Sequence, residues 1–289
     1  METEQPKPPH EGLKKGLYVI PTMFTAANVG MGFLAILSSM RGFQIALNDP
    51  VGASHYFNSA AIAIGLAILF DTLDGRVARM TRTATEIGVQ FDSLADVLTF
   101  GIAPIALMYS WSFGLVFKEG TQEHALGVFL LFMYLMCGAF RLARFNLQAT
   151  RPRVLLEGTP KLDKKNFVGL PIPPAAGLLA SIVHFAPMPL SGYGEGTPRY
   201  LSFLMMILIA VLGVLMVSTL RYTSFKTFGS GRRNLYIFLL IAATGMAIWL
   251  YSEYVLLIIS GIYVSHGVIW YVLSLLKPGQ RTQTSEAEG

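Results

Sequence analysis

Residues 71–96 read D-T-L-D-G-R-V-A-R-M-T-R-T-A-T-E-I-G-V-Q-F-D-S-L-A-D, and this stretch joins two long apolar segments. It places two pairs of aspartates at the ends of those segments, Asp71 with Asp74 and Asp92 with Asp96. A carboxylate beside hydrocarbon is costly to keep and usually serves an ion, a proton or a reaction. The stretch therefore indicates a membrane-spanning fold and also where function is to be sought.

Apolar runs of about 20 residues, the length that carries a helix across a hydrocarbon core of roughly 30 Å, recur along the chain. Of its 289 residues, 53% are hydrophobic and only 13% are charged. We therefore predict an all-α fold, a polytopic integral membrane helix bundle. Eight spans are expected, at 17–39, 55–75, 91–115, 125–147, 168–188, 200–220, 234–251 and 253–276.

The basic residues are distributed unevenly between the predicted connections. If the N-terminus is cytoplasmic, all of the 22 Lys and Arg residues except Arg41, Lys118 and Arg199 fall on or near the cytoplasmic side. The positive-inside rule expects this skew, so both termini are predicted to be cytoplasmic. The skew also accounts for the net charge of +5 without nucleic acid. The single cysteine, Cys137, excludes an intramolecular disulfide.

The spacing of the aspartates predicts that they converge. Asp71 and Asp74 are three residues apart, and Asp92 and Asp96 are four apart, so each pair shares one helix face. The connection at 76–90 would return the chain at one membrane face and bring the pairs together. Four such carboxylates repel unless a cation neutralises them, and Mg²⁺, Mn²⁺ or Ca²⁺ suits oxygen ligands. Solvated helix caps are the alternative, which explains one or two of them.

Phosphate chemistry is the function that such a site favours. Mg²⁺ typically keeps part of its coordination shell for substrate phosphates, and two ions can clamp a displacement at phosphorus. Gly75 and Gly88 remove bulk where a nucleotide could approach the backbone. Ala78 is small, and Arg79 offers a planar fork for phosphate oxygens.

The pattern D-x2-D-G-x2-A-R-x8-G-x3-D-x3-D is met at all eight fixed positions of 71–96. It resembles the signature of the CDP-alcohol phosphatidyltransferases, which are integral membrane enzymes of phospholipid synthesis. The segment P-T-M-F-T-A-A-N at 21–28 is similar to that family's P-N-x-x-T-x-x-N opening, with Thr22 in place of Asn. The segments that look most like the serine-using branch are 91–104, 141–146, 166–176 and 215–226.

The resemblance implies metal-dependent transfer of a phosphatidyl group from CDP-diacylglycerol to L-serine, with phosphatidylserine and CMP as products. Mg²⁺ or Mn²⁺ is expected, with two ions bound. The implied metal ligands are Asp71, Asp74, Asp92 and Asp96, and Asp96 is also the expected general base. The implied CDP-diacylglycerol pocket contains Asp71, Gly75, Ala78, Arg79, Gly88 and Asn28.

Arg141, Arg144 and Asn146, within R-L-A-R-F-N, would hold the lipid phosphate or the serine carboxylate. Alternatively, the two arginines only reach lipid headgroups as ordinary anchors at the membrane surface. His184 and His266 are expected to be packed or interfacial side chains rather than metal ligands.

Two alternatives of function stay open. The acceptor could be glycerol 3-phosphate or an inositol phosphate, and a divalent-cation transporter is the alternative of another class. The expected organisation is a mobile N-terminus (1–15), a six-helix catalytic core (16–230), two additional helices (231–277) and a mobile tail (278–289). The resemblance further implies a homodimer in a prokaryotic cell (inner) membrane, with the active site facing the cytoplasm.

Overall fold

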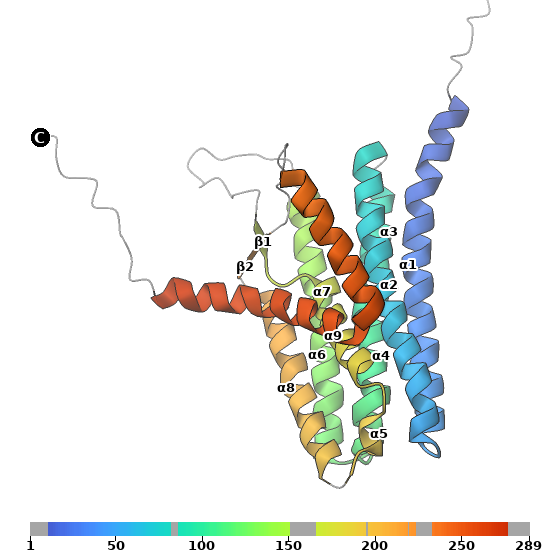
Figure 1. Ribbon diagram of the computed structural model, residues 1–289, viewed down its shortest axis with the longest axis vertical. Coiled ribbons are helices and arrows are strands. Elements are labelled where there is room, and N and C mark those ends of the chain that lie inside the picture. The colour runs from blue at the N-terminus through green and yellow to red at the C-terminus, as the bar shows by residue number, and fades with distance from the viewer. Residues whose placement is uncertain are drawn as a thin grey trace, which may run out of the picture.

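The computed structural model describes residues 11–81, 86–150, 166–194, 196–218, 220–223 and 233–276. Within these ranges the chain is almost entirely helical, and its long helices form an elongated bundle (Figure 1). Residues 11–15 of the predicted mobile N-terminus already belong to the first helix, whereas residues 1–10 and the tail 278–289 lie outside the described residues. The predicted all-α fold is confirmed.

The elements follow one another along the chain with short connections. The helices are α1 (Glu11–Ala46), α2 (Pro50–Thr81), α3 (Glu86–Asp96), η1 (Val97–Ile102), α4 (Ala103–Met108), η2 (Tyr109–Phe113), α5 (Gly114–Val116), α6 (Gln122–Thr150), α7 (Ile172–Phe185), η3 (Leu190–Gly192), α8 (Thr197–Val217) and α9 (Arg233–Leu276). Two short strands, β1 (Asn166–Val168) and β2 (Arg221–Thr223), pair antiparallel.

Seven helices in the described part of the chain are long and apolar enough to span a membrane, where the sequence predicted eight spans. The difference lies in α9, which joins the last two predicted spans into one element. At Tyr251 its backbone leaves the helical region, with φ −140° and ψ 47°, so a kink separates a proximal from a distal limb. The apolar sequence on both sides of the kink hides this break from a hydropathy argument.

The connection that carries the aspartate signature is also shorter than predicted. Helix α2 continues to Thr81, and α3 already begins at Glu86, whereas the sequence argument placed a connection over 76–90. Asp71 and Asp74 therefore lie inside a helix rather than at its end. A continuing helix satisfies the backbone of this segment internally, which is the arrangement that a membrane requires.

Glu86–Val116 form one continuous rod that contains two π-helical segments, η1 and η2. The first follows Asp96 directly and precedes Pro104, which has no N–H to donate to the Phe100 carbonyl. That carbonyl instead accepts a hydrogen bond from the Tyr134 hydroxyl of α6, at 3.2 Å. Such π segments recur at functional sites, because they change the direction in which neighbouring side chains project.

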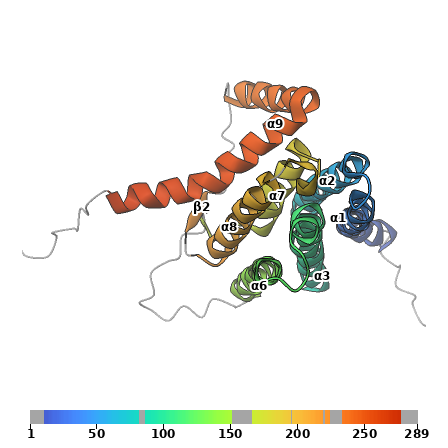
Figure 2. The ribbon, with the colours of Figure 1, turned by 90° about the horizontal axis from the view of Figure 1, so that it is seen from below.

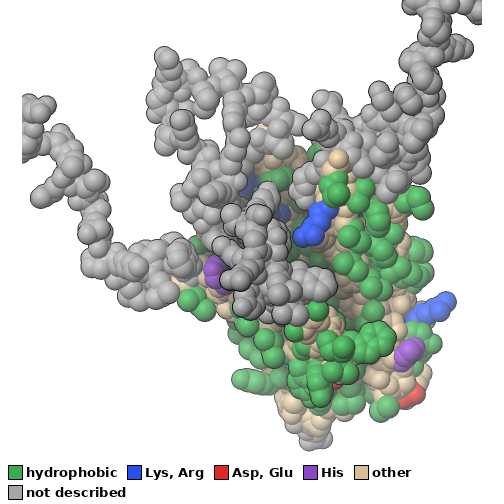
Figure 3. Space-filling view, turned by 45° about the horizontal axis from the view of Figure 1, so that its top comes forward, with side chains coloured by type: hydrophobic (Ala, Val, Ile, Leu, Met, Phe, Trp, Pro, Cys, Tyr) green, Lys and Arg blue, Asp and Glu red, His purple; other side chains and the backbone are tan. Residues whose placement is uncertain are grey.

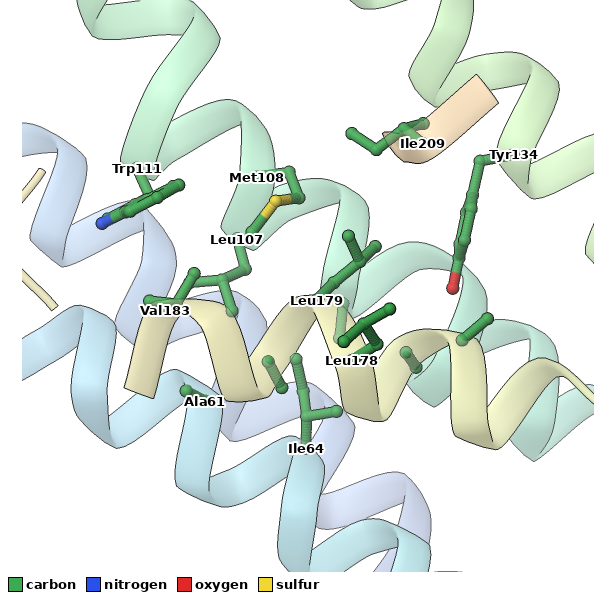
Figure 4. Close-up of a cluster of buried hydrophobic side chains, with 14 of the residues drawn as sticks. Ala61, Ile64, Leu107, Met108, Trp111, Tyr134, Leu178, Leu179, Val183 and Ile209 are labelled. Atoms are coloured by element: carbon green, nitrogen blue, oxygen red, sulfur yellow. The ribbon is translucent and has the colours of Figure 1, made fainter. Parts of the chain in front are cut away.

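The core lies where α7 crosses the middle of the bundle (Figure 4). Leu178, Leu179 and Val183 of α7 are buried among side chains of α2, α4, α6 and α8. At one edge of this cluster the Trp111 indole N–H is shared between the carbonyls of Ala186 and Met188, at 3.1 and 2.9 Å. This packing fixes α7 and the rod of α3 to α5 against α2.

The outer surface is apolar, as a bilayer requires. Hydrophobic side chains cover most of the described surface visible in Figure 3, and the few basic groups there stand apart from one another. Phe33, Phe129 and Trp249 are among many large apolar side chains that are more than half exposed. A water-soluble monomer rarely exposes apolar patches of this extent, so the exposure fits contact with lipid.

The strand pair and Gly169 join the end of α8 to the start of α7. Gly169 has a φ of 82°, and a side chain there would collide with the Met216 carbonyl. The next residue donates its N–H to the Leu215 carbonyl at 3.0 Å. Because α7 begins at this junction, the junction sets the position of α7 in the bundle.

Helix α1 approaches the π segment η1 most closely at Gly32. A β-carbon added to Gly32 would lie 2.5 Å from the Thr99 hydroxyl oxygen and 2.9 Å from the Thr99 Cα, whereas Gly30 has open space around it. We expect Gly32→Ala to push α1 away from η1 and to destabilise the protein by about 1–3 kcal/mol, the usual cost of overpacking. Thermal unfolding in detergent measures this.

The matched control is Gly30→Ala, which adds the same methyl group to the same helix. It should leave the unfolding midpoint unchanged or slightly raised, because alanine is the better helix former. Equal midpoints for the two variants would contradict the close approach of α1 and η1.

Candidate functional site

Three of the four signature aspartates converge. Asp71 of α2 and the pair Asp92 and Asp96 of α3 each offer a carboxylate oxygen, and these oxygens lie within 4.8 Å of one another. Asp71 and Asp96 are close enough to share a side-chain hydrogen bond. Two carboxylates can approach in this way only with a proton or a cation between them. The predicted convergence of α2 and α3 is therefore present in the structure.

Asp74 lies beside this group but faces α1. Its carboxylate accepts a hydrogen bond from the Thr25 hydroxyl, and its side chain is buried. It still interacts electrostatically with Asp71 and Asp92. Asp74 therefore belongs to the same acidic region, although the structure does not place it within the group of three.

The sequence argument missed Thr25, although it was the Thr of the quoted P-T-M-F-T-A-A-N segment. Thr25 lies three residues before Asn28, so the two share a face of α1. This spacing, together with the cost of polar groups in a hydrophobic span, was the signal that could have identified Thr25.

Asn28 is completely buried, and within the described part of the chain neither atom of its amide has a hydrogen-bond partner. Its backbone carbonyl accepts from the Thr99 hydroxyl, at 3.3 Å. An unpaired buried amide costs free energy that a ligand can recover. This observation favours Asn28 as a binding residue.

The two arginines of R-L-A-R-F-N occupy different environments. Arg141 is buried, interacts electrostatically with Asp96, and has an Nε without a hydrogen-bond partner among the described residues. Arg144 instead donates to the Val217 carbonyl at the C-terminal end of α8, at 3.4 Å. Of the two, only Arg141 stands where it can contact a substrate held by the aspartates.

Asn146 donates to the Ser93 hydroxyl at 2.8 Å and so bridges α6 and α3. It borders a groove of about 350 Å³ between these helices. None of the four aspartates lines this groove, whose residues are Gln90, Ser93, Leu94, Val97, Ala139, Leu142, Ala143, Asn146 and Leu147. Asn146 is therefore adjacent to the acidic site but directed to another face of α3.

The four remaining predicted residues surround the aspartates in the sequence. Gly75 and Gly88 are exposed, which is compatible with a ligand approaching the backbone. Ala78 and Arg79 continue α2, but their side chains lie outside the described residues. His184, predicted to be packed, is buried and hydrogen-bonded to Asn58 and Ser252, away from the acidic group.

The donor set fits a hard divalent cation. All three converging groups are carboxylates, and Asp96 Oδ1 is buried without a hydrogen-bond partner in the described chain. Oxygen-only ligands are typical of Mg²⁺, Mn²⁺ and Ca²⁺ sites and not of zinc sites, which favour nitrogen and sulfur. Three carboxylates also leave coordination positions free for a phosphate.

Comparison with known proteins agrees with this geometry. A CDP-diacylglycerol–serine O-phosphatidyltransferase of Helicobacter pylori (strain ATCC 700392 / 26695) is 32% identical over 90% of this chain and 94% of its own length. A protein of the same name from Methanocaldococcus jannaschii is 31% identical over 72% of this chain and 82% of its own. The archaetidylserine synthase of Methanothermobacter thermautotrophicus is 34% identical over 70% and 69%.

The family model for CDP-alcohol phosphatidyltransferases matches residues 18–217, a stretch that contains the four aspartates, Asn28 and Arg141. The match lies inside the predicted catalytic core, 16–230, and ends before α9. The chain belongs to the CDP-alcohol phosphatidyltransferase family.

Proposed function

We propose that this protein transfers the phosphatidyl group of CDP-diacylglycerol to L-serine, giving phosphatidylserine and CMP. The observation that carries the proposal is the group of Asp71, Asp92 and Asp96 with the buried Arg141 beside it. This arrangement combines a site for a divalent cation with a separate fixed positive charge. The names of the relatives support serine as the acceptor.

In the proposed reaction the serine hydroxyl oxygen attacks the phosphorus next to diacylglycerol. The bond from that phosphorus to the oxygen of CMP breaks, and CMP leaves with the electron pair. Asp96 takes the hydroxyl proton, a role supported by its burial and by the unpaired Oδ1. A buried carboxylate can accept a proton more readily than an exposed one, because burial penalises its charged form.

The other aspartates would hold Mg²⁺ or Mn²⁺. Asp71, Asp74 and Asp92 serve as ligands in this proposal, and Asp96 completes a second site. A divalent cation supplies Lewis-acid stabilisation of the pyrophosphate charge. Thr25 orients Asp74 through its hydrogen bond. Gly75, Ala78, Arg79, Gly88 and Asn28 would surround the cytidine diphosphate.

Arg141 is the proposed partner of the serine carboxylate. In serine the carboxylate lies only three bonds from the hydroxyl oxygen, so a cation beside the general base can reach it. Arg141 is placed in this way next to Asp96. A guanidinium holds a carboxylate through two parallel hydrogen bonds, which would orient the acceptor for attack.

The orientation in the membrane stays a prediction from the charge distribution, with both termini and the acidic site on the cytoplasmic side of a prokaryotic cell (inner) membrane. The homodimer and the number of bound ions are likewise predictions. A divalent-cation transporter is not supported by the family assignment.

The decisive measurement is CMP release from CDP-diacylglycerol by the purified protein with Mn²⁺ or Mg²⁺. L-Serine, glycerol 3-phosphate and an inositol phosphate are compared as acceptors. We expect release with serine alone, with phosphatidylserine as the lipid product, and complete loss in EDTA. Release with another acceptor would refute serine, and undiminished release after thorough chelation would refute the metal dependence.

Asp92→Asn should reduce CMP release by about 100-fold or more, because an amide no longer balances the charge of a bound cation. Asp49→Asn is the matched control, since Asp49 lies in the connection between α1 and α2, outside the acidic group. It should retain wild-type activity. Substantial residual activity in Asp92→Asn would remove Asp92 from the ligand set.

Exchanging the two arginines separates binding from structure. Arg141→Ala should lower kcat/KM for serine by about 100-fold, because it removes a charge-assisted contact to the substrate. Arg144→Ala should chiefly lower the thermal unfolding midpoint, since Arg144 holds the C-terminal end of α8. Kinetics and thermal unfolding are measured on both variants, and the reverse order of effects would contradict this assignment.

A further inference from the structure

The distal limb of α9, residues 252–276, carried no chemical signature in the sequence and lies outside the family match. It nevertheless packs along α7 before it extends beyond the bundle, as Figures 1 and 2 both show. Its two faces differ. The outward face exposes Tyr254, Ile258, Ile262 and Ile269, each by more than half of its surface.

The inward face of this limb carries its polar groups. Ser252 hydrogen-bonds to His184 at 2.9 Å, and His184 in turn contacts Asn58 of α2 at 2.6 Å. Two turns later Ser260 meets Ser181 of α7 at 2.9 Å. Paired polar groups between membrane helices fix their register, so the limb has a defined position on α7.

The register brings Tyr263 and Val264 inward, directly after Ser260. Val264 is only 7% exposed, and Tyr263 packs against the buried core. Tyr263 also interacts electrostatically with Arg141, the same side chain that interacts with Asp96. The charged and titratable groups that act on Arg141 are thus Asp96, Tyr263 and Arg144.

We propose that Tyr263 is a positioning residue that holds the Arg141 guanidinium toward Asp96, and that the distal limb of α9 forms one wall of the acceptor site. Arg141 is buried with an unpaired Nε, so its orientation must be set by its neighbours. Arg144 repels it, whereas the polar edge of a tyrosine attracts it. The limb therefore contributes to acceptor binding through Arg141. This inference rests on the proposed function of Arg141.

Tyr263→Phe tests the proposal, because it removes the hydroxyl and keeps the ring that packs against the core. We expect KM for serine to rise about three- to tenfold, the effect of losing one polar interaction, with kcat and the thermal midpoint nearly unchanged. Tyr254→Phe is the matched control on the outward face of the same limb, and it should behave as wild type.

A double-mutant cycle with Arg141→Lys shows whether Tyr263 acts through Arg141. In the Arg141→Lys background, Tyr263→Phe should change KM by less than about twofold, since coupled residues are not additive. Thermal stabilisation by added serine provides a second readout that needs no turnover, and Tyr263→Phe should diminish it.

An unchanged serine KM in Tyr263→Phe, or the same fold-change in both backgrounds, would overturn the positioning role. A fall in the thermal midpoint with an unchanged KM would show a purely structural tyrosine. If the wild-type protein uses another acceptor, the proposed function fails on its own, and the same cycle is run with that acceptor.

Discussion

Repulsion among carboxylates in a water-poor part of the bundle is the constraint on which the rest of the structure depends. Asp71, Asp92 and Asp96 bring their oxygens within 4.8 Å of one another, and Asp74 stands beside them. No helix packing at the membrane boundary would tolerate this without compensating positive charge. The surrounding features supply or prepare such compensation: a donor set suited to a divalent cation, and a buried arginine at one side.

The helices that carry these aspartates are held rigidly. Helix α1 meets η1 at Gly32 and Thr99, the Tyr134 hydroxyl takes the carbonyl that Pro104 leaves unpaired, and Trp111 fixes the rod to the loop after α7. Rigid placement matters for a displacement at phosphorus, because attacking and leaving oxygens must be aligned within a fraction of an ångström. The fold is thus a frame that fixes two helix segments against each other.

The sequence predicted most of the fold and the centre of the site. Hydropathy located the spans, and the i, i+3 and i, i+4 spacings placed Asp71, Asp92 and Asp96 on facing surfaces. It could not predict that α2 continues to Thr81 or that the helix after Asp96 becomes π-helical. Those features depend on tertiary contacts, such as the hydroxyl of Tyr134, that lie far away in the sequence.

The two arginines of R-L-A-R-F-N show the same limit at the level of single residues. They are three positions apart, so a sequence argument gives them one face and one role. The structure separates them, because α8 ends beside Arg144 and exposes its last carbonyls there, whereas Arg141 lies one turn deeper, beside Asp96. The role of each arginine thus follows from the helix that packs against it. The same reasoning gives the distal limb of α9 a function that its apolar composition conceals, since Tyr263 matters only through the charge it faces.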